Sequence, residues 1–155
     1  MVEPSAPFRI RPALGGDLPG VTALQAACFA DAWGEASIAK FLTDPHGLSL
    51  LAVAGGGRPA GFALCRMVGG ECEILSLGVA AEWRGRGLGA RLLEAIAAAA
   101  GARGAERIYL EVAVQNTEAG ALYHRHGFRQ VGQRPGYYPR RDAPPGDARL
   151  LCRTL

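Results

Sequence analysis

The chain has few aromatic residues, a single lysine and no pattern of metal-binding cysteines. Aromatic residues make up 7% of the 155 positions and hydrophobic residues of all kinds 49%, so alanine, leucine and valine must fill most of a core. The cysteines (Cys28, Cys65, Cys72 and Cys152) form no C-x-x-C pair, and no histidines stand at metal-ligand spacing. We therefore expect reduced, buried thiols, no disulfide framework and no metal site.

Long apolar stretches are also missing. No uninterrupted apolar run reaches the roughly 18 residues of a membrane-spanning helix, and the N-terminal residues lack the apolar segment typical of a signal peptide. The net charge is +3, which suits an anionic ligand but is too small to predict nucleic-acid binding. These features predict a soluble cytoplasmic protein with neither a nucleic-acid nor a membrane partner.

Chain length and apolar periodicity predict one domain over residues 8–155, preceded by a flexible tail at residues 1–7. We expect strands at 8–11, 48–54, 60–68, 71–79, 107–114, 128–131 and 148–152, helices at 17–29, 37–42, 88–100 and 118–126, and a long loop at 135–146. The helix at 88–100 would connect the parallel strands 71–79 and 107–114. The predicted fold class is α+β, an α/β/α sandwich with a mixed, mostly antiparallel sheet.

Residues 84–89 (Arg-Gly-Arg-Gly-Leu-Gly) separate the strand at 71–79 from the helix that begins at Leu88. Glycines allow a sharp turn that presents successive N–H groups, and a helix N-terminus adds unpaired donors and a positive dipole end. With two arginines beside it, this junction predicts a pyrophosphate-binding site. The alternatives are a glycine-rich turn without a ligand and a dinucleotide site, because residues 85–90 also satisfy G-x-G-x-x-A. Too few βα units follow the loop for a dinucleotide fold.

Two motifs in this order resemble those of a known enzyme superfamily. Arg84-x-x-Gly87-x-Gly89, after a strand and at the start of a helix, resembles the acyl-CoA loop of the GNAT N-acetyltransferases. Residues 116–128 resemble their N-x-x-A-x-x-L-Y-x-x-x-G-F segment. The resemblance covers residues 8–155. It implies the GNAT acyl-CoA N-acyltransferase fold, with central parallel strands that splay apart, and acetyl-CoA as cosubstrate without a metal.

Within the superfamily, the chain resembles the bacterial RimI-type ribosomal-protein-alanine N-acetyltransferases. The similarity lies in Phe29 and Trp33, in Leu110-Glu111-Val112, in Tyr137-Tyr138-Pro139, and in Asp147-Ala148 of the last strand. It implies transfer of acetyl from acetyl-CoA to the N-terminal alanine of a small-subunit ribosomal protein. Gly34 and Gly120 depart from the family pattern and leave the peptide preference open.

The resemblance also implies which residues hold acetyl-CoA. The strand end at Leu77, Gly78 and Val79 is expected to pair with the pantetheine amides as an added strand would, with a bulge at Gly78 that exposes an N–H to the thioester carbonyl. The pyrophosphate is expected on the loop and the first helical turn, at Arg84, Gly85, Arg86, Gly87, Leu88, Gly89 and Ala90. Asn116 is expected to contact the CoA arm, to cap the following helix, or to do both.

Glu111 is the predicted general base. An α-amine has a pKa near 7.7–8.0 and is partly neutral at cytoplasmic pH, so one carboxylate acting through water can remove the remaining proton. The alternatives are Glu73 as the base and a salt-bridged structural role for Glu111. Tyr123 is the predicted general acid for the departing thiolate, since a phenol with a pKa near 10 stays protonated; its alternative is a core tyrosine that anchors its helix.

Trp33, Arg134, Tyr137 and Tyr138 are predicted to line a groove for an extended peptide. Two other functions compete with this interpretation: a GNAT enzyme acting on a small amine such as a polyamine or an antibiotic, and a non-catalytic acyl-CoA-binding module. Polycationic substrates favour an acidic cleft, whereas the late loop of this chain is basic and aromatic. The presence of both Glu111 and Tyr123 argues against the non-catalytic module.

Overall fold

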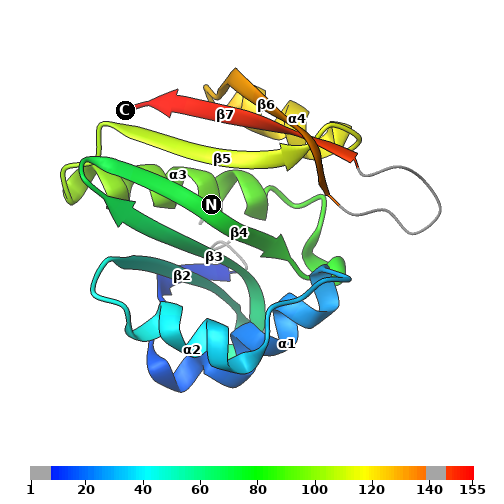
Figure 1. The fold of residues 1–155 in the computed structure, drawn as a ribbon. Helices are drawn as coiled ribbons and strands as arrows, with labels where there is room; N and C mark the ends of the chain where they lie inside the picture. Colours follow the sequence, from blue (N-terminus) through cyan, green and yellow to red (C-terminus); the bar gives the residue numbers. More distant parts are fainter. Residues whose placement is uncertain (1–7, 139–145) are drawn as a thin grey trace, which may run out of the picture.

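One mixed sheet with helices on both faces forms the described part of the molecule (Figure 1). The computed structural model describes residues 8–138 and 146–155, without the side chains of residues 137 and 138. In these residues seven strands run in the order β1-β2-β3-β4-β5-β7-β6. They are β1 (Phe8–Pro12), β2 (Gly47–Ala54), β3 (Pro59–Val68), β4 (Glu71–Val79), β5 (Arg107–Ala113), β6 (Arg129–Tyr138) and β7 (Gly146–Thr154).

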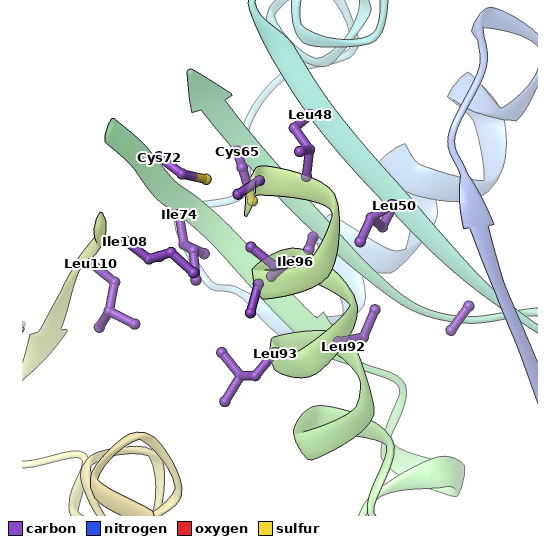
Figure 2. Packing of buried hydrophobic residues seen from close by; sticks show 14 of the residues in the cluster. Leu48, Leu50, Cys65, Cys72, Ile74, Leu92, Leu93, Ile96, Ile108 and Leu110 are labelled. Atoms are coloured by element: carbon purple, nitrogen blue, oxygen red, sulfur yellow. The ribbon is translucent and has the colours of Figure 1, made fainter. Parts of the chain in front are cut away.

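Two pairs of helices cover the sheet. On one face, α1 (Leu18–Cys28) and α2 (Glu35–Thr43) enclose a small apolar cluster with β2 and β3, and on the other, α3 (Leu88–Ala102) and α4 (Thr117–Arg125) cover the larger one. Short 3-10 turns at Gly15–Asp17, Gly55–Gly57 and Ala81–Trp83 complete the elements. Leu92, Leu93 and Ile96 of α3 are buried over the central strands (Figure 2). All four cysteines are free thiols; Cys65 and Cys72 are buried as predicted, whereas Cys28 and Cys152 are only partly buried.

The sheet has one parallel pair among the described strands, β4 with β5, and it is joined only at its beginning. The register runs from Glu71 opposite Arg107 to Ile74 opposite Leu110. Beyond that point the two strands diverge (Figure 1), while β4 stays paired with β3 and β5 with β7. The predicted fold, with splayed central parallel strands in a mostly antiparallel sheet, is confirmed.

A β-bulge lies in β4, but at Leu75 rather than at the predicted Gly78. Ser76 is opposite Leu64 and Ile74 is opposite Cys65, so Leu75 is the extra residue. The bulge reverses the alternation of β4: Cys72 and Ile74 belong to the cluster under α3, and after the bulge it is Leu77 that packs there. Gly78 is paired regularly with Phe62.

Gly78 is a glycine because of close packing on the α1 face. A Cβ on this residue would lie 2.7 Å from Phe62 Cε1 and 3.0 Å from Cys28 Sγ. The predicted bulge at this position is therefore wrong. A glycine stands here because the buried Phe62 ring of β3 occupies the space that a Cβ would need.

Several predicted boundaries differ from those observed. The helix expected over 88–100 ends two residues later, because α3 continues to Ala102 and ends before Gly104, whose φ is +88°. Residues 135–138 and 146, expected in a loop, belong to β6 and β7. Asp17, expected at the start of the helix 17–29, immediately precedes α1, and its carboxylate makes no capping hydrogen bond to that helix. It accepts from the Leu14 N–H at 2.8 Å and pairs with Arg11 at 2.8 Å.

Candidate active site

A cavity of about 650 Å³ opens where β4 and β5 diverge. Its walls come from the end of β4, the end of β5, the segment after α1, the start of α3 and the exposed turns of α4. The lining residues are Gln25, Phe29, Ala30, Asp31, Trp33, Ile74, Leu75, Ser76, Leu77, Gly78, Val79, Arg84, Gly89, Leu110, Glu111, Val112, Ala113, Asn116, Glu118, Ala119, Leu122 and Tyr123. The cavity thus brings together most of the residues predicted for acetyl-CoA binding with both predicted catalytic residues.

The glycine loop meets the cavity at its two ends, because Arg84 and Gly89 line the cavity and residues 85–88 do not. Gly85 and Gly87 have φ of +74° and +79°, a left-handed conformation that side-chain-bearing residues avoid, and a Cβ on either would meet nothing within 4 Å. No side chain caps the helix. The first N–H groups of α3 have no acceptor within the helix and lie at its positive dipole end. This open cradle of amides fits a diphosphate.

The side chains of the loop and of the first turn of α3 lie in different surroundings. Arg84 lines the cavity, and its Nε donates to the Val79 carbonyl at 3.0 Å. The Arg86 guanidinium lies 4.9 Å from the centre of the Trp83 ring. The Leu88 side chain is buried in the core beneath α3, and Ala90 borders a separate groove with Arg91 and His126. Leu88 and Ala90 can therefore contribute main-chain N–H groups rather than side chains.

Helix α4 is held against the first turn of α3 at the other wall. A Cβ on Gly89 would lie 3.3 Å from Leu122 Cδ2, so the glycine allows the two helices to approach closely. Asn116 caps α4, since its Oδ1 accepts from the Ala119 N–H at 3.2 Å. The predicted cap is confirmed, and the same side chain borders the cavity.

Glu111 projects from the face of β5 opposite to its buried residues Ile108, Leu110 and Val112. Its side chain is 15% exposed, and its Oε1 lies 3.0 Å from Arg134 Nε on β6. Glu73, the alternative base, is exposed and lies outside the lining of the cavity. Of the two glutamates, only Glu111 borders the cavity, and it does so within the ion pair that its alternative structural role predicts.

Tyr123 reaches the same cavity from α4. Its ring packs edge-on against Phe128, with ring centres 5.8 Å apart, and it is half-buried against the main apolar cluster. This packing fixes the direction of the ring from the backbone of α4. Glu111 and Tyr123 thus line one cavity from different elements, a strand and a helix.

Of the four residues predicted to line the acceptor groove, one lines the cavity and another contacts a cavity residue. Trp33 lines the cavity, and its ring stacks on Phe41 of α2 with centres 5.0 Å apart. Arg134 is 60% exposed and reaches the site through Glu111. The side chains of Tyr137 and Tyr138 lie outside the described part of the structure. Sequence reasoning did not identify Gln25 and Ser76, two polar residues of the cavity wall; a glutamine among the apolar positions of α1 was the only available signal.

Neither a metal centre nor a membrane-spanning helix is present in residues 8–138 and 146–155. Histidine, cysteine, aspartate and glutamate side chains nowhere gather in threes at metal-binding distance in this part of the chain. The longest described helix, α3, has 15 residues, and none of the described helices has the length and apolarity to cross a bilayer.

Residues 18–128 match the model of the acetyltransferase (GNAT) family. The chain belongs to this family. It is 33% identical over 144 residues to the N-alpha-acetyltransferase RimI of Mycobacterium tuberculosis, a match that covers 89% of each chain. It is 29% identical over 126 residues to the ribosomal protein bS18-alanine N-acetyltransferase of Escherichia coli, covering 81% of this chain and 84% of that relative.

Solved structures agree with the sequence matches. The crystal structure of the ribosomal-protein-S18-alanine N-acetyltransferase from Escherichia coli superposes with a TM-score of 0.89 at 28% identity, over 96% of this chain and 94% of that one. A further sequence relative is a longer Mycobacterium leprae protein, which is 46% identical over 83 residues. This match spans only 21% of the length of that relative. The predicted GNAT fold, the resemblance to RimI-type enzymes and the assignment as an acetyl-CoA-dependent N-acetyltransferase are confirmed.

Proposed function

We propose that this GNAT enzyme transfers acetyl from acetyl-CoA to the N-terminal α-amine of a protein in the cytoplasm, and that its acceptor is the N-terminal alanine of a small-subunit ribosomal protein. One observation carries the proposal: Glu111 and Tyr123 line a single cavity at the point where β4 and β5 diverge. The printed activities of the relatives from Mycobacterium tuberculosis and Escherichia coli support the choice of acceptor.

Acetyl-CoA binds, in this proposal, from the N-terminus of α3 to the divergence of the strands. The diphosphate is held by the main-chain N–H groups of residues 85–90, with Arg84 and Arg86 supplying positive charge. The pantetheine runs beside Leu77, Gly78 and Val79 as an added strand, and Asn116 contacts the CoA arm. This path is supported by the free edge of β4 beyond Ile74, which β5 has left.

The reaction is direct attack of the amine on the thioester carbonyl. The neutral amine forms the new C–N bond, and its proton passes through water to Glu111. The tetrahedral oxyanion requires an N–H donor, for which the unpaired residue of the bulge, Leu75, is the candidate. Collapse of the intermediate breaks the C–S bond, and Tyr123 donates a proton to the leaving thiolate. The products are the acetylated N-terminus and free coenzyme A.

The acceptor enters beside the segment after α1. Phe29 and Trp33 offer apolar surface there, and Phe29 remains 39% exposed at the edge of the cavity. Arg134, with Tyr137 and Tyr138, is proposed to form the opposite side of the peptide groove. An α-amine suits this site because a larger fraction of it is neutral at pH 7 than of a lysine side chain, whose pKa is near 10.4.

The test is acetyl transfer by Glu111→Gln, with Glu73→Gln as the matched control. Both changes replace a strand glutamate by its neutral isostere, but only Glu111 borders the cavity. We expect Glu111→Gln to lower kcat on an alanine-terminated peptide by about 100-fold or more, with acetyl-CoA affinity by calorimetry unchanged. Glu73→Gln should retain wild-type kcat. Loss of activity in Glu73→Gln, with activity retained in Glu111→Gln, would assign the base to Glu73.

The choice of acceptor is tested with the wild-type protein. Release of free thiol is followed with peptides beginning Ala-Arg, with the same peptides blocked at the N-terminus, with lysine-bearing peptides and with polyamines. Thiol release that depends on a free N-terminal alanine supports the proposal. Preference for polyamines would indicate a small-amine acetyltransferase, and acetyl-CoA binding without transfer to any amine would indicate a non-catalytic module.

A further inference from the structure

Gln25 is a buried polar side chain in the apolar layer between α1 and the sheet. It is 1% exposed, on a helix whose other buried residues, Val21 and Leu24, are apolar. An amide removed from water destabilises the fold unless its donor and acceptor are both bonded. The two ends of this amide are bonded, and their partners lie on different walls of the cavity.

The partners of Gln25 are the main chain of Trp33 and the side chain of Ser76. Its Nε2 donates to Ser76 Oγ at 2.7 Å, and its Oε1 accepts from the Trp33 N–H at 3.2 Å. Ser76 directly follows the bulge of β4. Trp33 belongs to the segment between α1 and α2, which lines the cavity on the side proposed for the acceptor. One side chain therefore connects the acceptor wall to the strand that is proposed to carry the thioester.

We propose that Gln25 is a positioning residue for the acceptor, an inference that rests on the proposed function. Its amide holds the segment 29–34 at a fixed distance from β4, so that an amine seated on this segment reaches the thioester beside Glu111. Stacking of the Trp33 ring on Phe41 fixes the segment on the side of α2. The hydrogen bond from the Trp33 N–H to Gln25 fixes the main chain of the segment on the side of β4. Orientation at this level matters because small misplacements of reacting groups lower rates strongly.

The bulge explains why Ser76 is available for this contact. In an uninterrupted strand Ser76 would share the face of Cys72 and Ile74, which is packed under α3. The extra residue Leu75 turns Ser76 toward α1 instead. The bulge at Leu75, which directly follows the last residue of β4 paired with β5, therefore directs the hydroxyl that accepts from Gln25.

Gln25→Met tests the proposal, with Thr22→Val as the matched control. Methionine keeps the length of the side chain but leaves the Trp33 N–H and the Ser76 hydroxyl without their partner. Thr22→Val removes another buried polar group of α1, a hydroxyl without a hydrogen-bond partner in the described residues. We expect Gln25→Met to raise the KM for an alanine-terminated peptide about tenfold while the acetyl-CoA Kd stays within twofold, and Thr22→Val to change neither.

A second readout is independent of acetyl transfer. Amide hydrogen exchange of the Trp33 N–H, measured by NMR on the protein alone, should be at least tenfold faster in Gln25→Met and unchanged in Thr22→Val. Unchanged exchange, or an unchanged acceptor KM in folded Gln25→Met, overturns the inference. If Gln25→Met does not fold, Ser76→Ala decides by the same two measurements. Failure of the wild-type protein to acetylate any N-terminus would instead contradict the proposed function. The exchange measurement would still test whether Gln25 holds the main chain of Trp33.

Discussion

Gly78→Ala should destabilise the protein because β4 and the α1 face are in direct contact at this residue. The added Cβ would lie 2.7 Å from Phe62 Cε1 and 3.0 Å from Cys28 Sγ. Phe62 is fully buried and its ring packs edge-on against Phe29, so it has little room to retreat. Overpacking of this kind costs about 1–3 kcal/mol. We expect the free energy of unfolding to fall by about 2 kcal/mol, and Tm by about 4–8 °C for a chain of this size.

The assay is thermal and urea unfolding followed by circular dichroism, with Gly120→Ala as the control. Gly120 lies inside α4, and a Cβ there meets nothing within 4 Å. The same chemical change should therefore raise stability by about 0.5–1 kcal/mol. If Gly78→Ala is as stable as Gly120→Ala, then Phe62 does not pack against β4 as described, and the wall of the cavity at Gly78 is misplaced.

Four further substitutions probe the glycine loop, with Gly56→Ala as its control, the acid and the N-terminal turn. Gly87→Ala and Gly56→Ala each force alanine to a φ near +78° and should each lose about 1 kcal/mol of stability; only Gly87→Ala should weaken acetyl-CoA binding in calorimetry, and equal affinities would contradict the diphosphate site. Tyr123→Phe should slow thiol release at least tenfold without lowering Tm, and an unchanged rate would leave Tyr123 a structural role. The hydrogen bonds from Arg11 lower the pKa of Asp17 to about 2, so Asp17→Asn should cost about 1 kcal/mol at pH 7. That difference should disappear as the pH falls through about 2, and urea unfolding at both pH values measures it.

The order and type of the elements could be predicted from the sequence because apolar periodicity and glycine positions report local structure. The bounds expected for β4 match those observed, since the strand lies between turn residues. The end of α3 was placed two residues early, because Gly101 is tolerated inside a helix at a cost of about 1 kcal/mol, whereas Gly104, with its positive φ, follows the observed end. Long-range pairing extended β6 beyond Pro135, where local signals predicted a loop.

Residues that line the cavity could be predicted where a motif names them, and could not be predicted where tertiary packing decides. Glu111 and Tyr123 were found from motifs, and the structure brings both to one cavity. The bulge was assigned to Gly78 because glycine is common in bulges, but register between β3 and β4 decides its place. Gln25 gave almost no signal, since its partners lie 8 and 51 residues away in the chain. Such contacts depend on tertiary packing, which a single sequence does not display.

A crystal structure with coenzyme A and an alanine-terminated peptide tests the account most directly. We expect diphosphate oxygens within hydrogen-bond distance of the N–H groups of residues 85–90, sulfur where β4 and β5 diverge, and the peptide amine between the thiol and Glu111. A diphosphate bound elsewhere, or a peptide whose amine lies away from Glu111, would contradict it.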